Sequence, residues 1–330
     1  MDIRSLKNTA SQRLETARDE KKIVMIYAAI TVGLSALVTV VNYLASSGIS
    51  QTGGLSNIGL RSILSTLQRV LPIVQSVLLM IAELGYINAA LRMARGQYAS
   101  PNSLKMGIDR FFPLIRCTLM QGLVYGIAGM AGFYLAMQIF LMTPLSNATM
   151  EILLPLTEDM SVLSNGVLQL DMETTLLLAE AMIPLFLLFG VICIVICLPL
   201  MYWFRMANYV LIDKPALGGW AVLKESRKIM RRRCLELFKL DLSFWWYYLL
   251  LIASGFLCYG DAILALAGIT LPWSGDVSFF IFYALFLVVT LAIYYFFLNK
   301  IEVSYALFYE QNRPVEKQDN SVVLGNIFQM

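Results

Sequence analysis

Long apolar runs are the feature that most constrains what this chain can fold into. A helix rises about 1.5 Å per residue, so about 20 apolar residues cross the roughly 30 Å hydrocarbon core of a bilayer. Stretches of about this length recur along the sequence, and we expect each to form a transmembrane helix. The six predicted spans are 23–45, 69–91, 118–142, 175–201, 243–260 and 278–298. The expected fold is an all-α, polytopic six-helix transmembrane bundle.

Composition supports this fold class and excludes others. Hydrophobic residues make up 58% of the 330 residues and charged residues 14%. A soluble domain averages about 45–50% apolar and about 25% charged residues. These values exclude a soluble globular enzyme and an intrinsically disordered protein.

The placement of Lys and Arg predicts the orientation of the bundle. The leader 1–22, the loops 92–117 and 202–242 and the tail 299–330 are rich in basic residues. The three remaining loops contain only Arg61, and the long loop 143–174 carries Glu and Asp with no Lys or Arg. Because basic loops stay inside, we expect both termini to be cytoplasmic and the acidic loop to be external. The chain then divides into a cytoplasmic amphipathic leader (1–22), a transmembrane domain (23–298) and a cytoplasmic tail (299–330).

Two cytoplasmic segments have the pattern of amphipathic helices. In the leader, the apolar residues Ile3, Leu6, Ala10, Leu14 and Ala17 recur at helical spacing. In the fourth loop a helix is expected over 216–240, with Leu217, Trp220, Leu223, Met230, Cys234 and Leu237 on its apolar side. The same segment carries a dense basic patch: Lys224, Arg227, Lys228, Arg231, Arg232 and Arg233. This patch is either a docking site for anionic lipid or a partner protein, or only a set of inside-positive topology determinants. Nucleic acid is not an expected ligand, because no aromatic residues alternate with these cations on a recognisable fold.

A second candidate site lies within the predicted membrane. Arg69, Ser76 and Glu83 are spaced by seven and therefore share one face of their helix. Gln121 on the third span and Glu180 on the fourth could join them. An ionisable residue inside a membrane is a candidate functional group, because its burial is costly. Two interpretations stay open, a path for a solute or proton and a neutral glutamic acid that fixes helix packing.

Residues that carry most enzyme chemistry are scarce. The chain contains no His, which excludes Ser-His and Cys-His nucleophiles and the commonest zinc ligand. Its five cysteines form no C-x-x-C pair, and hydrolase, zinc-protease and ATP-binding loop motifs are missing from the sequence. We expect no catalytic residues, no metal site and no cofactor. Oligomeric state and ligand identity stay open.

The fourth loop resembles a known family. The carrying residues are 221–230 (Ala-Val-Leu-Lys-Glu-Ser-Arg-Lys-Ile-Met), 237–244, Asp213 before them and 306–310 after the last span. They are similar to the Firmicutes-type bacterial integral-membrane family named domain of unknown function 975. That family usually has a glycine where Arg232 stands. The resemblance implies a six-helix protein of the bacterial plasma membrane and brings no activity with it.

Two functions therefore remain in view. One is binding or transport of a small solute or lipid through a polar bundle interior. The alternative is a membrane scaffold or regulatory protein whose basic cytoplasmic loop binds anionic lipid or a partner protein.

Overall fold

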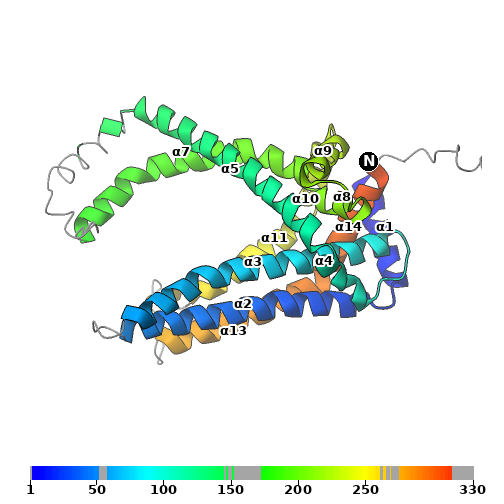
Figure 1. The fold of residues 1–330 in the computed structure, drawn as a ribbon, viewed down its shortest axis with the longest axis horizontal. Helices are drawn as coiled ribbons and strands as arrows, with labels where there is room; N and C mark the ends of the chain where they lie inside the picture. Colours follow the sequence, from blue (N-terminus) through cyan, green and yellow to red (C-terminus); the bar gives the residue numbers. More distant parts are fainter. Residues whose placement is uncertain are drawn as a thin grey trace, which may run out of the picture. The chain divides into compact units, whose positions relative to one another are not determined.

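The computed structural model is built of helices, and the part of the chain that it describes contains no strand (Figure 1). It describes residues 2–51, 58–144, 146–147, 151, 172–260, 263–264, 268 and 275–313. Its longer helices are α1 (Ile3–Thr16), α2 (Glu20–Gln51), α3 (Ile58–Ala94), α5 (Phe111–Leu141), α7 (Met172–Phe204), α9 (Gly219–Met230), α11 (Trp245–Phe256), α13 (Gly275–Ile293) and α14 (Asn299–Asn312). Shorter elements are η2 (Pro101–Lys105), α4 (Met106–Asp109), α8 (Ala207–Asp213), α10 (Cys234–Leu242) and η4 (Leu257–Tyr259). A π-helical turn over Tyr294–Leu298 connects α13 with α14.

The predicted all-α polytopic fold is confirmed. Within the described residues, five helices are long and apolar enough to span a membrane, and a bent pair makes up to six. The five are Glu20–Ser47, Ser62–Ala94, Phe111–Leu141, Met182–Asp213 and Val277–Asn312. The pair is Cys234–Leu242 with Trp245–Tyr259, bent by 59° in the region of the predicted fifth span. Every predicted span overlaps one of these segments.

The chain divides into two compact units, which we call unit 1 (1–115 and 206–330) and unit 2 (116–205). Unit 2 is an antiparallel pair formed by most of α5 and by α7. Ala136, Phe140 and Leu185 form its buried core. The rings of Phe133 and Phe189 meet edge to face with centroids 5.6 Å apart.

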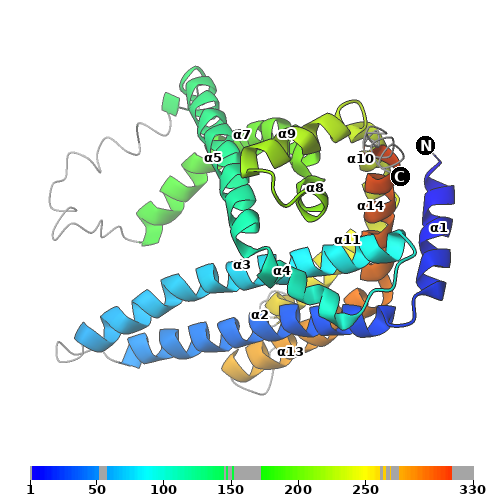
Figure 2. The same ribbon diagram turned by 45° about the vertical axis from the view of Figure 1, so that its right-hand side comes forward.

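In unit 1, the long helices α2, α3 and α13 lie side by side (Figure 2). Polar side chains join α2 and α3 along their length. Gln75 Nε2 donates to Ser35 Oγ at 3.1 Å, and Gln68 Nε2 donates to Asn42 O at 3.3 Å. These two bonds fix the antiparallel register of the pair. On the other side of α2, the Tyr283 hydroxyl donates to Thr39 Oγ1 at 2.8 Å.

The best-packed core of unit 1 lies at one end of these helices. Residues 84–91 of α3 are all buried, as are most residues of α8 and α14. The 37 residues of α3 extend about 55 Å, well beyond the roughly 30 Å of a bilayer core. The helix α3 is therefore longer than a bilayer core requires, and the buried core lies at its C-terminal end. Residues 299–312, which hydropathy assigned to the tail, form α14 and supply much of the core.

The basic loop also differs from expectation. A single helix over 216–240 is wrong, because α9 ends at Met230 and α10 begins at Cys234. Arg232 between them has a φ of 69°, in the left-handed region that favours glycine. Glycine at this position, as the resemblance implies for related chains, would adopt the same turn without the steric cost of a Cβ.

Candidate functional site

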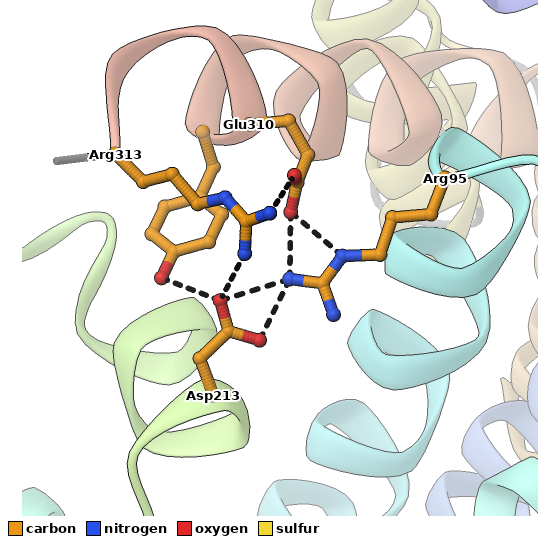
Figure 3. Close-up of polar contacts among 5 residues, drawn as sticks. Arg95, Asp213, Glu310 and Arg313 are labelled. Atoms are coloured by element: carbon orange, nitrogen blue, oxygen red, sulfur yellow. Dashed lines mark hydrogen bonds and ion pairs between the residues drawn. The ribbon is translucent and has the colours of Figure 1, made fainter. Parts of the chain in front are cut away.

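A charged cluster joins the ends of three helices in the core of unit 1 (Figure 3). Arg95 follows the last residue of α3, Asp213 is the last residue of α8, and Glu310 and Arg313 lie at the end of α14. The Arg95 guanidinium donates from Nη2 to both Asp213 oxygens at 2.7 and 2.8 Å, and from Nε to Glu310 Oε1 at 2.8 Å. Arg313 approaches Asp213 Oδ2 at 3.3 Å and Glu310 Oε2 at 3.0 Å. The cluster thus pairs each carboxylate with both guanidinium groups.

Burial makes these contacts strong. The side chains of Asp213, Glu310 and Arg95 are 15%, 17% and 23% exposed, whereas that of Arg313 is 43% exposed. Burial alone would lower the pKa of Arg95, but its hydrogen bonds with Asp213 and Glu310 outweigh that effect and raise the pKa. Hydrogen bonds between charged groups are about twice as strong as those between neutral ones, and here one Arg95 nitrogen, Nη2, serves both oxygens of Asp213. The cluster can therefore clamp α3, α8 and α14 together.

Tyrosines extend the cluster into the neighbouring packing. The Tyr309 hydroxyl donates to Asp213 Oδ2 at 3.0 Å, and its ring stacks on that of Tyr209 with centroids 5.3 Å apart. The Tyr209 hydroxyl donates in turn to Glu302 Oε2 at 3.2 Å. Every one of these side chains comes from α8 or α14, which ties the two helices together along their length.

The leader helix α1 also packs against the core of unit 1. Lys7 Nζ donates to the Ser243 carbonyl at 2.8 Å and lies 4.0 Å from the centroid of the Phe244 ring. Burial, with a smaller contribution from Lys300, lowers the pKa of Lys7. The Tyr305 hydroxyl on α14 donates to Asp241 of α10, two residues before Ser243. The leader is therefore part of the folded core of unit 1.

The basic patch lies on the exposed face of α9. Trp220, Lys224, Arg227, Lys228 and Arg231 recur at helical spacing and are all exposed. The opposite face is buried and consists of Val222, Leu223, Ser226, Ile229 and Met230. The placement of Trp220 on the apolar side is wrong, since its side chain is 50% exposed and the Lys224 ammonium lies 5.9 Å from its ring. Arg232 and Arg233 extend the exposed cations past the end of the helix.

Comparison with known proteins identifies the family. The sequence pattern of the family described as "Protein of unknown function (DUF975)" matches residues 1–315. The chain belongs to this family. The resemblance found at the fourth loop is confirmed, and the match includes α1, α9 and all residues of the charged cluster. No curated protein matches the chain, and no solved structure does.

In this DUF975 protein, four of the five predicted intramembrane residues are exposed. Arg69, Ser76 and Glu83 share one side of α3 and are all exposed. The register of α2 and α3 places Glu83 level with Tyr27, seven residues or about 10 Å along α2 from Glu20. Glu83 is also the last exposed residue of α3 before the buried stretch 84–91.

The remaining two members of that set lie in unit 2. Gln121 Nε2 donates to the Phe204 carbonyl at 3.5 Å, and Glu180 is exposed on α7. Among the described residues, no group of three or more Cys, Asp and Glu side chains is placed to hold a metal ion. The polar path stays a prediction.

Replacing Glu83 with Gln tests that prediction. If Glu83 lies on a solute path, at least one ion or metabolite in a panel should raise the melting temperature of the wild type and leave that of Glu83→Gln unchanged. The reason is that a ligand that binds only the folded state stabilises it by an amount that grows with the logarithm of one plus the ratio of ligand concentration to Kd. Glu15→Gln, an equal change on an exposed residue of α1, serves as the control. Identical responses of both variants to every compound would contradict the path.

The charged cluster was not found by sequence reasoning. Its residues lie at positions 95, 213, 310 and 313, and no spacing rule connects them. The available signal was that Asp213 and Glu310 belong to the segments that resemble the family. Only the packing of three helices brings these residues together.

Proposed function

We propose that this DUF975 protein is an integral protein of the bacterial plasma membrane that binds anionic phospholipid through α9 and acts as a membrane scaffold or regulator. Both termini face the cytoplasm, where the leaflet is anionic. The single observation that carries the proposal is the exposed face of α9, which combines cations with an exposed Trp. That combination favours the headgroup level of an anionic leaflet.

The supporting chemistry extends into α10. Leu235, Phe238 and Leu242 are exposed there, at 75%, 44% and 57%. Acidic neighbours compensate the patch only in part, since Lys228 lies 4.0 Å from Glu225 and Arg233 lies 3.2 Å from Glu236. The charged clamp of Arg95, Asp213 and Glu310 supports the scaffold role, because it joins α8, which contacts α9, to α3 and α14. A polar solute path has no comparable support, because four of its five predicted residues, Arg69, Ser76, Glu83 and Glu180, are exposed.

The charge of α9 is tested by the triple variant Lys224→Gln, Lys228→Gln and Arg231→Gln. Each cation near an anionic surface contributes about 1 kcal/mol, so their loss should weaken binding by about 100-fold. The measurement is a titration of detergent-purified protein with short-chain phosphatidylglycerol, followed by thermal shift. Phosphatidylcholine of the same chain length should bind both proteins weakly.

A matched control separates the patch from net charge. The triple variant Arg4→Gln, Arg18→Gln and Arg92→Gln removes the same charge from exposed residues outside α9. It should keep nearly wild-type affinity for phosphatidylglycerol. Equal losses in the two triple variants, or no preference of the wild type for the anionic lipid, would contradict the proposal. A wild type that binds a cytoplasmic protein through α9 and shows no lipid preference would favour the partner-protein alternative.

A further inference from the structure

An apolar groove runs along unit 1 between α2, α3 and the segment η2–α4. Its volume is about 560 Å³. The larger side chains that line it include Ile26, Ile30, Leu37, Leu78 and Leu104. Small residues open the space between them, namely Ala29, Gly33 and Ala82. A Cβ added to Gly33 would meet no atom within 4 Å, so the groove is empty at this position.

The length of the groove matches one leaflet of a bilayer. Its lining on α2 extends from Ile26 to Leu37. These eleven helical steps correspond to about 16 Å, close to half of the roughly 30 Å hydrocarbon core. Since α2 begins at the charged residues Glu20, Lys21 and Lys22, the groove lies in the leaflet on that side.

The loop after α3 closes the groove at its headgroup end. The loop returns along α3 and packs so tightly that a Cβ on Gly85 would lie 2.1 Å from the Leu104 carbonyl oxygen. A Cβ on Gly107 would lie 1.9 Å from the Ile81 carbonyl oxygen, and Asn88 Nδ2 donates to the Ser103 carbonyl at 3.1 Å. These contacts place η2 and α4 against 81–88 of α3, opposite the first turns of α2. Lys105, at the end of η2, therefore lies near the Ile26 end of the groove.

Lys105 is the one charged residue among those that line the groove. Its side chain is exposed, and within the described part of the chain it forms no ion pair. An ammonium at headgroup level above an apolar groove is complementary to a molecule with an anionic head and a hydrocarbon tail. A free soluble anion would gain nothing from the apolar walls.

We propose that this groove binds one acyl chain of an anionic phospholipid of the cytoplasmic leaflet, whose phosphate contacts the Lys105 ammonium. The site is separate from α9 in sequence and in kind. Here two helices and the segment η2–α4 flank one acyl chain, whereas α9 presents charge to the headgroups of many lipids. The inference takes from the proposed function only the cytoplasmic orientation of the N-terminus and does not rest on lipid binding by α9.

The experiment uses a phosphatidylglycerol probe that carries a diazirine in one acyl chain. The full-length protein is reconstituted in phosphatidylcholine vesicles with a small fraction of the probe, irradiated, and mapped by peptide mass spectrometry. We expect labels on 26–37 and 78–82. Gly33→Leu adds a side chain that occupies the empty space of the groove, so it should lower this labelling at least fivefold. Ala29→Leu, one turn away, fills the same space and should act in the same way.

Two further variants control for side-chain size and for charge. Gly126→Leu places the same side chain on an exposed helical glycine of unit 2 that also has open space around it. In this variant, residues 26–37 and 78–82 should be labelled as strongly as in the wild type. Lys105→Gln should reduce the preference for the phosphatidylglycerol probe over the matching phosphatidylcholine probe by about fivefold. Unchanged melting temperatures confirm that the variants fold.

Three outcomes would overturn the proposal. The first is labelling of 26–37 that Gly33→Leu and Ala29→Leu leave unchanged. The second is equal labelling by the anionic and zwitterionic probes in the wild type. The third is that neutralising α9 lowers labelling of the groove as much as Gly33→Leu does, because the probe would then report only its general enrichment around the protein. Absence of label on 26–37 in the wild type, as expected if a second copy of the chain covers the groove, would overturn the proposal as well.

Discussion

Replacing Asp213 with Ala is expected to lower the free energy of unfolding by about 3 kcal/mol. Asp213 accepts hydrogen bonds from Arg95, Arg313 and Tyr309, and its side chain is 15% exposed. Its removal leaves the guanidinium of Arg95 partly buried with only Glu310 to balance it. Removing one partner of a buried pair is costly because the other charge stays buried without compensation. At roughly 2–4 °C per kcal/mol, the apparent melting temperature should fall by about 6–12 °C.

The matched control removes the exposed member of the same cluster. Arg313→Ala keeps the Arg95–Asp213 pair, and because its side chain is 43% exposed its loss should cost no more than about 1 kcal/mol. The double variant Asp213→Ala with Arg95→Met should recover part of the loss, since it removes the unpaired charge. Equal effects of Asp213→Ala and Arg313→Ala would show that the cluster is a surface network and not a clamp.

Replacing Gly85 with Val should produce an equally large loss through a different mechanism. The new Cβ would lie 2.1 Å from the carbonyl oxygen of Leu104, and backbone cannot move aside as a flexible side chain can. Overpacking typically costs about 1–3 kcal/mol, and a clash with backbone belongs at the top of that range or above it. To relieve the clash, η2 and α4 must separate from α3. The measurements are the melting temperature and protease cleavage within 96–110, which should become much faster.

The control for this variant is Gly126→Val. Gly126 is also a helical glycine, but a Cβ there meets no atom within 4 Å, so the substitution should be nearly neutral. Gly107→Ala should resemble Gly85→Val, because its Cβ would lie 1.9 Å from the Ile81 carbonyl oxygen. Intact protection of 96–110 in Gly85→Val would contradict the close packing of this loop on α3. Since the loop carries Lys105, the variant should also weaken the preference for anionic lipid that we propose for the groove.

Local pattern was sufficient to predict the fold class. Apolar runs long enough to cross a bilayer leave few alternatives to spanning helices, because unpaired backbone groups cannot be tolerated in lipid. The amphipathic leader was likewise readable from spacing, and Leu6 and Ala10 are buried as the pattern indicates. The family could be recognised at the fourth loop, because the sequences of 221–230 and 237–244 are characteristic of it.

Other features depend on contacts that no local pattern contains. Tyr86 donates to Asn299 Oδ1 at 2.6 Å, and Asn299 Nδ2 donates to the Glu20 carbonyl at 3.0 Å, which joins three segments far apart in the sequence. The position of Trp220 was mistaken because hydropathy does not distinguish an interfacial aromatic residue from a core one. The break at Arg232, whose φ of 69° is left-handed, was missed because the apolar spacing of Leu223, Met230, Cys234 and Leu237 continues across it.

The sequence by itself determined that this protein is a bundle of membrane-spanning helices with an amphipathic leader and a dense basic patch, because these properties follow from the order of apolar and charged residues along each helix. Only the tertiary structure decided that α14 belongs to the core, that Arg95, Asp213 and Glu310 form a clamp, and that Lys105 lies at the end of an apolar groove. Each of these depends on which helices pack together and in what register. That choice is set by the total free energy of many distant contacts, and no single segment contains it.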